Sequence, residues 1–228
     1  MPVIAVDGPA GSGKSSVCRA VARRCGLRYL DTGAMYRAMT WALLTDGVDV
    51  DDPHAVAQAA ARVVMSSGTD PDAPTIHVGS VDVSGPIRGP EVTAAVSAVS
   101  AVPAVRDLLV AMQRAEVESA RAVGAGIVVE GRDITTVVLP DADLKVYVTA
   151  DPAVRAQRRA RQDAEQGSGH ADVRATETAL LERDAKDSSR EASPLTQSAD
   201  ALLLDTTTLT LDETVDTLVG MVDSLGAR

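Results

Sequence analysis

The sequence is most constrained at residues 8–15, which read GPAGSGKS. The apolar run VIAV at residues 3–6 precedes this segment and ends at Asp7. A helical pattern follows from about residue 14 to residue 24, and Gly26 stands just past its end, where helices commonly stop. A strand, a glycine-rich turn and a helix in this order are typical of the first unit of a parallel α/β sheet. We therefore expect residues 3–6 to form a buried strand and residues 14–24 to form a helix.

The same eight residues match the full G-x-x-x-x-G-K-S pattern of a phosphate-binding loop. Glycines let backbone N–H groups turn toward phosphates, and the start of the following helix adds partial positive charge. We expect Lys14 to reach the β and γ phosphates of a nucleoside triphosphate and the Ser15 hydroxyl to bind Mg²⁺. The expected ATP-binding residues are Gly8, Pro9, Ala10, Gly11, Ser12, Gly13, Lys14, Ser15 and Ser16.

Four further apolar runs predict strands at residues 27–30, 127–130, 144–149 and 201–205. Helical patterns lie at about residues 34–44, 103–122, 152–186 and 211–225, with a mobile turn predicted at residues 166–170. This alternation predicts an α/β fold with a five-stranded parallel sheet and helices on both faces. Residues 45–88 differ, because Asp, Pro, Gly and Ser become frequent there. Alternating polarity at residues 75–83 predicts a half-exposed antiparallel strand or a hairpin within an inserted subdomain.

The composition excludes several classes of protein. The net charge of -10 disfavours a general nucleic-acid binder, which needs a basic surface. The longest apolar runs span a few residues, far short of the roughly 20 that a membrane-spanning helix needs. Cys18 and Cys25 lack metal-ligand spacing and are typical of reduced thiols. The sequence starts without a basic region or cleavage site. We expect a cytoplasmic monomer with no nucleic-acid or membrane partner.

Four more motifs follow predicted strands or lie in basic segments. They are DTGAMYR at residues 31–37, DVSGPIR at 82–88, VVEGRD at 128–133 and RDAKDSSR at 183–190. Strand ends line the ligand crevice of such a sheet, and the planar fork of Arg37 suits a phosphate. The spacing of Arg183, Asp187 and Arg190 places all three on nearly one helical face. At the strand ends, Glu130 is the favoured carboxylate to hold a magnesium-bound water, with Asp7 as the alternative.

Together with the phosphate loop, these motifs resemble the bacterial cytidylate kinases, a family of P-loop nucleoside monophosphate kinases. The resemblance runs from residue 6 to residue 190 and implies transfer of the γ-phosphoryl group of ATP to CMP or dCMP. The products would be CDP or dCDP, in pyrimidine nucleotide metabolism, with Mg²⁺ as the cofactor of ATP. The implied domains are a core at residues 1–32, 101–153 and 191–228, a nucleoside-monophosphate-binding insert at 33–100, and a mobile lid at 154–190.

The resemblance also implies roles for individual residues. CMP would contact Thr32, Tyr36, Arg37, Ser97, Arg106, Arg132, Asp133, Arg183 and Asp187. The catalytic set would be Lys14, Arg132, Arg158, Arg159, Arg183 and Arg190, and the metal set Ser15 and Glu130. The acceptor atoms of Asp133 would favour the exocyclic amine of cytosine over the carbonyl of uracil. Thr135 stands where the family usually has glycine, and we expect it to stiffen the turn that presents Asp133.

Two rival hypotheses come from the phosphate loop alone. One is another small-molecule P-loop kinase, such as a kinase of shikimate, which needs a carboxylate-binding site and leaves the insert unexplained. The other is a regulatory protein that uses ATP hydrolysis as a switch. Such a protein would show slow ATPase activity without a nucleotide acceptor.

Overall fold

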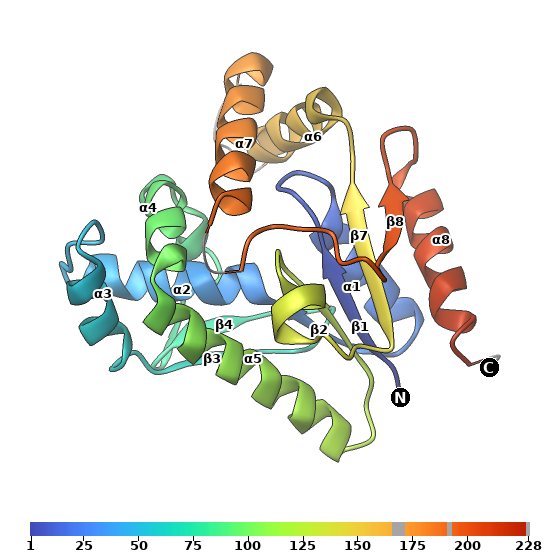
Figure 1. Cartoon of the computed structure of the whole chain (residues 1–228), viewed down its shortest axis with the longest axis horizontal. Helices are drawn as coiled ribbons and strands as arrows, with labels where there is room; N and C mark the ends of the chain where they lie inside the picture. The colour runs from blue at the N-terminus through green and yellow to red at the C-terminus, as the bar shows by residue number, and fades with distance from the viewer. Residues whose placement is uncertain (166–171, 191–192, 227–228) are drawn as a thin grey trace.

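The computed structural model describes residues 1–165, 172–190 and 193–226. Its centre is a five-stranded sheet with the strand order β2-β6-β1-β7-β8 (Figure 1). The strands are β1 Val3–Asp7, β2 Arg28–Asp31, β6 Ile127–Glu130, β7 Leu144–Thr149 and β8 Leu202–Asp205. All neighbouring strands in this sheet pair in parallel. The predicted α/β fold with a five-stranded parallel sheet is confirmed.

Helices cover both faces of this sheet because the residues of its strands alternate between two apolar clusters. Val3 and Ala5 of β1 pack in a cluster with residues of α2 Thr32–Thr45 and α5 Pro103–Ala122. Ile4 and Val6 pack on the other face, against α1 Lys14–Arg24 and α8 Leu211–Asp223. These four β1 side chains are at most 1% exposed. The buried central strand thus fixes the position of the loop that follows it.

The segment between β2 and α5 carries a second, smaller sheet. Its strands β3 Met65–Ser67, β4 Ile76–Val78 and β5 Val81–Asp82 are antiparallel, and β4 with β5 forms the predicted hairpin. The same segment holds α3 Pro53–Ala60, a 3₁₀ turn Pro86–Arg88 and α4 Pro90–Ala101. The sequence patterns did not predict α3 and α4. Helix α4 is made mostly of Ala and Val, with proline at its first position, so helix-forming alanines and a helix-start signal were both present in its sequence.

Two helices near the C-terminal third lie beyond the carboxyl ends of the central strands (Figure 1). They are α6 Pro152–Glu165 and α7 Val173–Ser188. The mobile turn predicted at residues 166–170 lies outside the described residues, as do residues 191–192 and 227–228 of the expected core. Within the described chain, no single helix has the length and apolar character to cross a membrane. Helices α4 and α5 are long and apolar enough only when taken together, and the chain bends by 95° between them.

Candidate active site

The loop between β1 and α1 is shaped by glycines at two positions. Gly8 has a φ of +147°, and a Cβ there would lie 1.9 Å from the carbonyl oxygen of Val148 on β7. Gly13 has a φ of +85° and precedes the first residue of α1. The Ser12 hydroxyl donates to the carbonyl of Pro9 at 3.0 Å. The loop therefore holds a closed turn in which the start of α1 faces the carboxyl edge of the sheet, as anion binding requires.

Lys14 lies beneath this loop and is only 5% exposed. Its ammonium donates to the Pro9 carbonyl at 3.0 Å. Burial, and then the charge of Arg132, lowers the pKa of Lys14 from its usual 10.5 to about 7. The nearby carboxylate of Glu130 acts in the opposite direction. Since a buried ammonium is costly without a counter-charge, the site favours an anion beside Lys14.

The lowered pKa of Lys14 predicts a pH dependence of stability. The unfolded chain binds this proton up to about pH 10.5, whereas the folded chain releases it near pH 7. The contribution of this group to stability therefore rises with pH across that window. We expect Lys14→Met to gain most in stability over wild type near pH 7 and to lose that gain as the pH approaches 10.5. Urea unfolding of both proteins at about pH 7 and about pH 9.5 measures this, and a constant difference would contradict it.

Two carboxylates end neighbouring strands below the loop, and they differ in what they bind. Asp7 accepts from the amides of Ile134 and Thr135 at 2.8 and 2.7 Å, and from the Thr135 hydroxyl at 2.7 Å. Burial raises the pKa of Asp7, and these hydrogen bonds oppose the rise. Thr135 lies in a π-helical turn, Ile134–Val138, so its hydroxyl ties this turn to β1. That this bond stiffens the turn stays a prediction.

Glu130 is held by a hydroxyl group instead. It accepts from the Tyr29 hydroxyl, and the nearby Ser15 side chain lowers its pKa. Burial and the charge of Asp31 raise the pKa of Glu130, while Lys14 lowers it. Ser15 and Glu130 together thus offer hard oxygen ligands next to the loop, the kind that Mg²⁺ takes in combination with substrate phosphates.

Arginines gather on the side of the site opposite the loop. Arg37 on α2 donates to the Ile87 carbonyl at 3.1 Å and to the Thr93 hydroxyl at 2.9 Å. Burial, followed by the charges of Arg183 and Arg159, lowers its pKa to about 10. The pKa of Arg183 is likewise lowered to about 10, by burial and then by Arg132. Burial first, and neighbouring guanidinium groups second, disfavour the charged forms of these arginines, which a phosphate dianion would stabilise.

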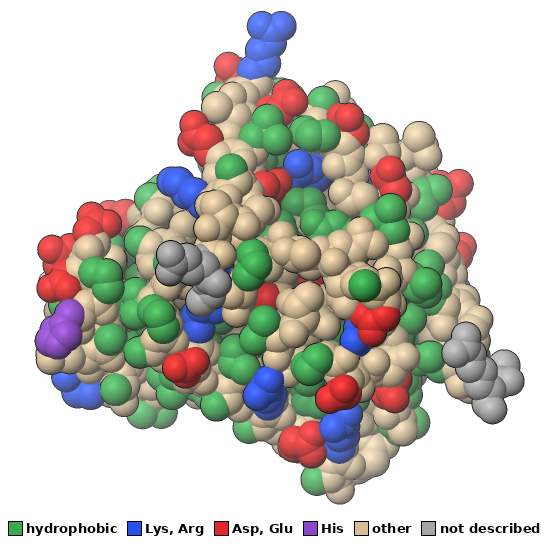
Figure 2. Space-filling model, in the orientation of Figure 1, with side chains coloured by type: hydrophobic (Ala, Val, Ile, Leu, Met, Phe, Trp, Pro, Cys, Tyr) green, Lys and Arg blue, Asp and Glu red, His purple; other side chains and the backbone are tan. Residues whose placement is uncertain are grey.

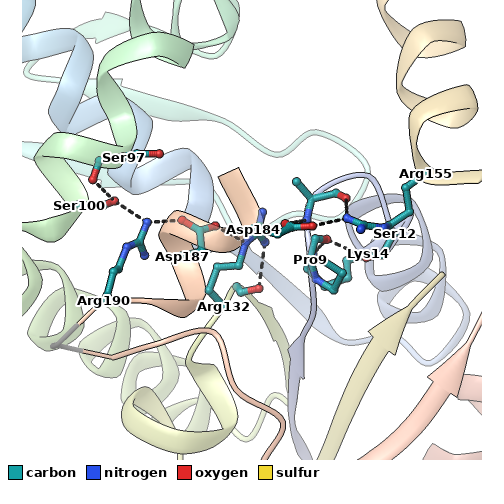
Figure 3. A network of polar contacts seen from close by, with 12 residues as sticks. Pro9, Ser12, Lys14, Ser97, Ser100, Arg132, Arg155, Asp184, Asp187 and Arg190 are labelled. Carbon is teal, nitrogen blue, oxygen red and sulfur yellow. Dashed lines mark hydrogen bonds and ion pairs between the residues drawn. The ribbon is translucent and has the colours of Figure 1, made fainter. Parts of the chain in front are cut away.

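Asp187 holds part of this arginine set together (Figure 3). It is 2% exposed and forms ion pairs with Arg132, at 3.1 Å, and with Arg190. Arg190 also donates to the Ser100 hydroxyl of α4 at 3.0 Å. Through these contacts α7 is connected to the end of β6 and to α4. The predicted residues Arg132, Asp187 and Arg190 are thus brought together.

A second buried ion pair joins Arg106 of α5 to Asp133, which follows β6. Both side chains are at most 6% exposed, and Arg106 also donates to the Ser100 carbonyl at 3.2 Å. The guanidinium lies over the ring of Tyr36, 5.4 Å from its centroid. Burial raises the pKa of Tyr36 to about 12, and its hydroxyl has no hydrogen-bond partner within the described chain. Three predicted CMP residues therefore form one contiguous cluster.

The remaining predicted residues make contacts of their own outside these two ion-pair clusters. The Thr32 hydroxyl donates to the Glu130 carbonyl at 2.7 Å and so fixes the start of α2 to β6. The Ser97 carbonyl accepts from the Ser100 hydroxyl at 3.1 Å. Arg158 is turned toward the loop after β8, where it donates to the Thr206 hydroxyl at 2.8 Å and the Leu209 carbonyl at 3.2 Å. Ser16 is exposed on the first turn of α1.

Sequence reasoning did not assign Arg155 and Asp184, although both touch the phosphate loop. Arg155 is 5% exposed, pairs with Asp184 and donates to the Ala10 carbonyl at 2.9 Å. Asp184 accepts from the Ala10 amide at 3.2 Å. Arg155 stands in an arginine-rich segment that resembles a solvated helix face, and only its burial distinguishes it.

A phosphate-binding loop at the end of β1, together with arginines from α2, from the segment after β6 and from α7, defines a P-loop kinase. A family model described as cytidylate kinase matches residues 4–224. The chain belongs to the cytidylate kinase family.

Relatives of the chain agree with this assignment. It is 58% identical over 195 residues to a cytidylate kinase of Streptomyces griseus subsp. griseus, covering 86% of this chain and 81% of that one. It is 53% identical over 193 residues to a cytidylate kinase of Nocardia farcinica, with coverage of 85% and 81%. A solved structure of an uncharacterized protein from Eubacterium ventriosum covers 98% of this chain and 99% of that one. Its TM-score of 0.55 at 11% identity concerns the fold alone.

Proposed function

We propose that this chain transfers the γ-phosphoryl group of ATP to CMP or dCMP, which gives ADP and CDP or dCDP. The supporting observation is the two-sided site of a cytidylate kinase family member. One side is the loop with buried Lys14, and the other is the set of repelling arginines around Arg37 and Arg183. A phosphate loop alone would bind a triphosphate. The arginines around Arg37 and Arg183 form a second group of positive charges, which suits the phosphate of a second substrate.

The chemistry needs positioning and charge neutralisation more than a base. The phosphate of CMP has a second pKa near ~6, so it is mostly a dianion at neutral pH. One of its oxygens forms the new bond to the γ-phosphorus, while the bond from that phosphorus to the bridging β-phosphate oxygen breaks. Lys14 balances charge on the donor side, and Arg132, Arg183 and Arg190 do so between the substrates, with Arg159 joining them from α6. For Arg158 to join them, its guanidinium has to leave its contacts with Thr206 and Leu209.

The proposed acceptor site contains the nine residues inferred from the family resemblance. Arg37 and Arg132 hold the phosphate, and Asp187 binds the sugar hydroxyls. Asp133, oriented by its ion pair with Arg106, accepts a hydrogen bond from the exocyclic amine of cytosine. Uracil presents a carbonyl there, so it leaves a buried acceptor unpaired at a cost of ~1–3 kcal/mol. Residues 33–100 form the nucleoside-monophosphate-binding insert and residues 154–190 the lid in this proposal.

The decisive test is the specificity constant for CMP, dCMP, UMP and AMP as acceptors, with ATP as the donor. CMP and dCMP are expected to exceed UMP, which lacks the amine that Asp133 would accept. They are also expected to exceed AMP, which carries its amine on a larger purine ring. If UMP or AMP is clearly the better acceptor, the proposed substrate is wrong. Release of ADP that does not depend on any added acceptor would instead favour a regulatory ATPase.

We further propose that ATP is used with Mg²⁺, held through Ser15 and Glu130 rather than through Asp7. When bound, the ion neutralises charge on the β and γ phosphates. The three hydrogen bonds that Asp7 accepts from the turn after β6 occupy its carboxylate. Glu130 accepts only from the Tyr29 hydroxyl among the hydrogen bonds of the described residues, and the Ser15 side chain is near enough to lower its pKa.

This assignment predicts the magnesium dependence of two variants. Glu130→Gln keeps the shape of the side chain but removes its charge, so half-maximal activity is expected to need at least ~10-fold more Mg²⁺. Asp7→Asn is the matched comparison and is expected to leave that concentration unchanged. Titration of activity with Mg²⁺ at saturating ATP measures both. A shift in Asp7→Asn and none in Glu130→Gln would reverse the assignment.

The proposal also includes a cytoplasmic monomer that binds small molecules rather than nucleic acid or membranes. The net charge of -10 supports this, and acidic side chains gather near the start of α3, where Asp49, Asp51 and Asp52 are exposed (Figure 2). Both cysteines are free, which is typical of reducing compartments. Sedimentation of the purified chain tests the oligomeric state.

A further inference from the structure

The tip of the phosphate loop is held by an ion pair between α6 and α7 (Figure 3). Asp184 of α7 accepts a hydrogen bond from the Ala10 amide at 3.2 Å. Arg155 of α6 donates to the Ala10 carbonyl at 2.9 Å and forms an ion pair with Asp184. Both backbone groups of one loop residue are therefore bound by two side chains that also bind each other. We call Ala10, Arg155 and Asp184 the clasp.

The clasp is a built, largely buried contact. The side chains of Arg155 and Asp184 are 6% and 15% exposed. The Nε of Arg155 also donates to the Ala150 carbonyl at 3.1 Å, so the guanidinium is fixed at three points. Ala10 packs with Ala156 and Leu180 in a small apolar cluster. Such a contact differs from the exposed pair of Arg24 and Asp216, whose side chains are 52% and 63% exposed.

The position of Asp184 on α7 gives the clasp a functional consequence. It directly follows Arg183 and precedes Asp187 by three residues, so all three lie within about one helical turn. Asp187 in turn binds Arg132 and Arg190. A rigid turn of helix thus joins the tip of the donor loop to the residues that hold the acceptor. Neither Arg155 nor Asp184 belongs to the proposed substrate-binding set, because their polar atoms are directed at each other and at backbone.

We propose that Arg155 and Asp184 are positioning residues that couple the donor and acceptor halves of the site. Filling the loop with a triphosphate fixes Ala10, and the clasp then fixes α7 with Arg183 and Asp187 in the position that receives the acceptor. This inference rests on the proposed function. Reciprocity requires that the acceptor strengthen binding of the donor by the same factor.

The test measures the dissociation constant of CMP with and without a non-hydrolysable ATP analogue and Mg²⁺. In the wild type, the analogue is expected to tighten CMP binding by ~5-fold or more. Asp184→Asn keeps an acceptor for the Ala10 amide but loses the charge that holds Arg155. It is expected to bring this factor close to one, to lower kcat and to change the affinity for each ligand alone by less than ~3-fold.

Three further proteins complete the experiment. Arg155→Lys keeps the charge but loses the planar fork, so an intermediate factor is expected. The double variant with Asp184→Asn is expected to lose no more coupling than Asp184→Asn alone, because the two residues act as a unit. Asp216→Asn removes an arginine-paired carboxylate on α8 and is expected to behave as wild type.

The possible results separate this inference from the proposed function. If the wild type does not phosphorylate CMP, the proposed function fails. If it does, but Asp184→Asn and Arg155→Lys keep the full coupling factor, the clasp is a structural contact and the inference fails. A wild type that shows activity without any coupling between the ligands also overturns it. Loss of both single-ligand affinities in parallel with thermal stability would likewise indicate a merely structural role.

Discussion

Replacing Lys14 by methionine is expected to lower kcat for CMP by at least about two to three orders of magnitude, since it removes a preorganised charge at the transferred phosphate. The fold is expected to survive. Lys14 is 5% exposed, and burial already disfavours its charged form, so an apolar side chain of similar length removes an unfavourable burial. The measurement combines steady-state kinetics with the free energy of unfolding.

The control for this variant is Lys145→Met, the same substitution on β7. Lys145 pairs with the exposed Asp200 at 2.6 Å, so its removal is expected to leave kcat unchanged. Near-normal turnover in Lys14→Met would show that the loop does not hold the transferred phosphate. Loss of turnover together with loss of the folded state would attribute a structural role to Lys14.

Asp133→Ala is expected to destabilise the protein by about 3–5 kcal/mol, because it leaves the guanidinium of Arg106 buried without its counter-charge. Arg106 is 4% exposed, and the pair lies between α5 and the end of β6. The KM for CMP is also expected to rise, since Asp133 is the proposed reader of cytosine. Urea unfolding measures the first effect and acceptor kinetics the second.

A double variant separates these two effects. Arg106→Met with Asp133→Leu replaces the pair by apolar groups and is expected to recover most of the stability, as such replacements often do. It is not expected to recover the affinity for CMP. Glu118→Ala serves as the control, because it breaks an exposed ion pair in which Glu118 is 67% and Arg121 48% exposed. Its expected loss of stability is ~0–1 kcal/mol. If Asp133→Ala costs no more than this control, the buried pair does not stabilise the fold.

The core of the fold was predictable because its signals are local. Apolar runs and helix-end residues reproduced the bounds of α1 Lys14–Arg24, α5 Pro103–Ala122 and β7 Leu144–Thr149. The prediction missed α4, which mixes alanine with valine and packs against α2 and α5, so its apolar residues show no clear helical period. Helix α3 begins with a local helix-start signal, the N-cap Asp52 followed by Pro53. The many Asp, Pro, Gly and Ser residues around it made this signal hard to distinguish from a loop.

The site shows the same division. Asp187 and Arg190 do lie together. The predicted single helical face is wrong for Arg190, however, because α7 ends at Ser188 and Arg190 stands two residues beyond it. The contacts of Ala10 with Asp184 and of Asp7 with Thr135 join residues 174 and 128 positions apart, so no local pattern contains them. Asp7 and Glu130 are both carboxylates at the ends of adjacent strands. Without these long-range contacts, both remained candidates to hold the magnesium-bound water. The roles assigned to individual site residues stay predictions until the variants are measured.

The crowding at Gly8 has a consequence for how such loops evolve. A side chain at this position would meet the backbone of β7 at 1.9 Å whether or not a nucleotide is bound. Glycine at position 8 is therefore demanded by the sheet, and a descendant that had lost catalysis would still retain it. Lys14 carries the opposite constraint, because burial disfavours its charged form and a bound phosphate would stabilise it. In a degenerate member of the family, the lysine would be the first to drift, so it, and not the glycine, marks a working enzyme.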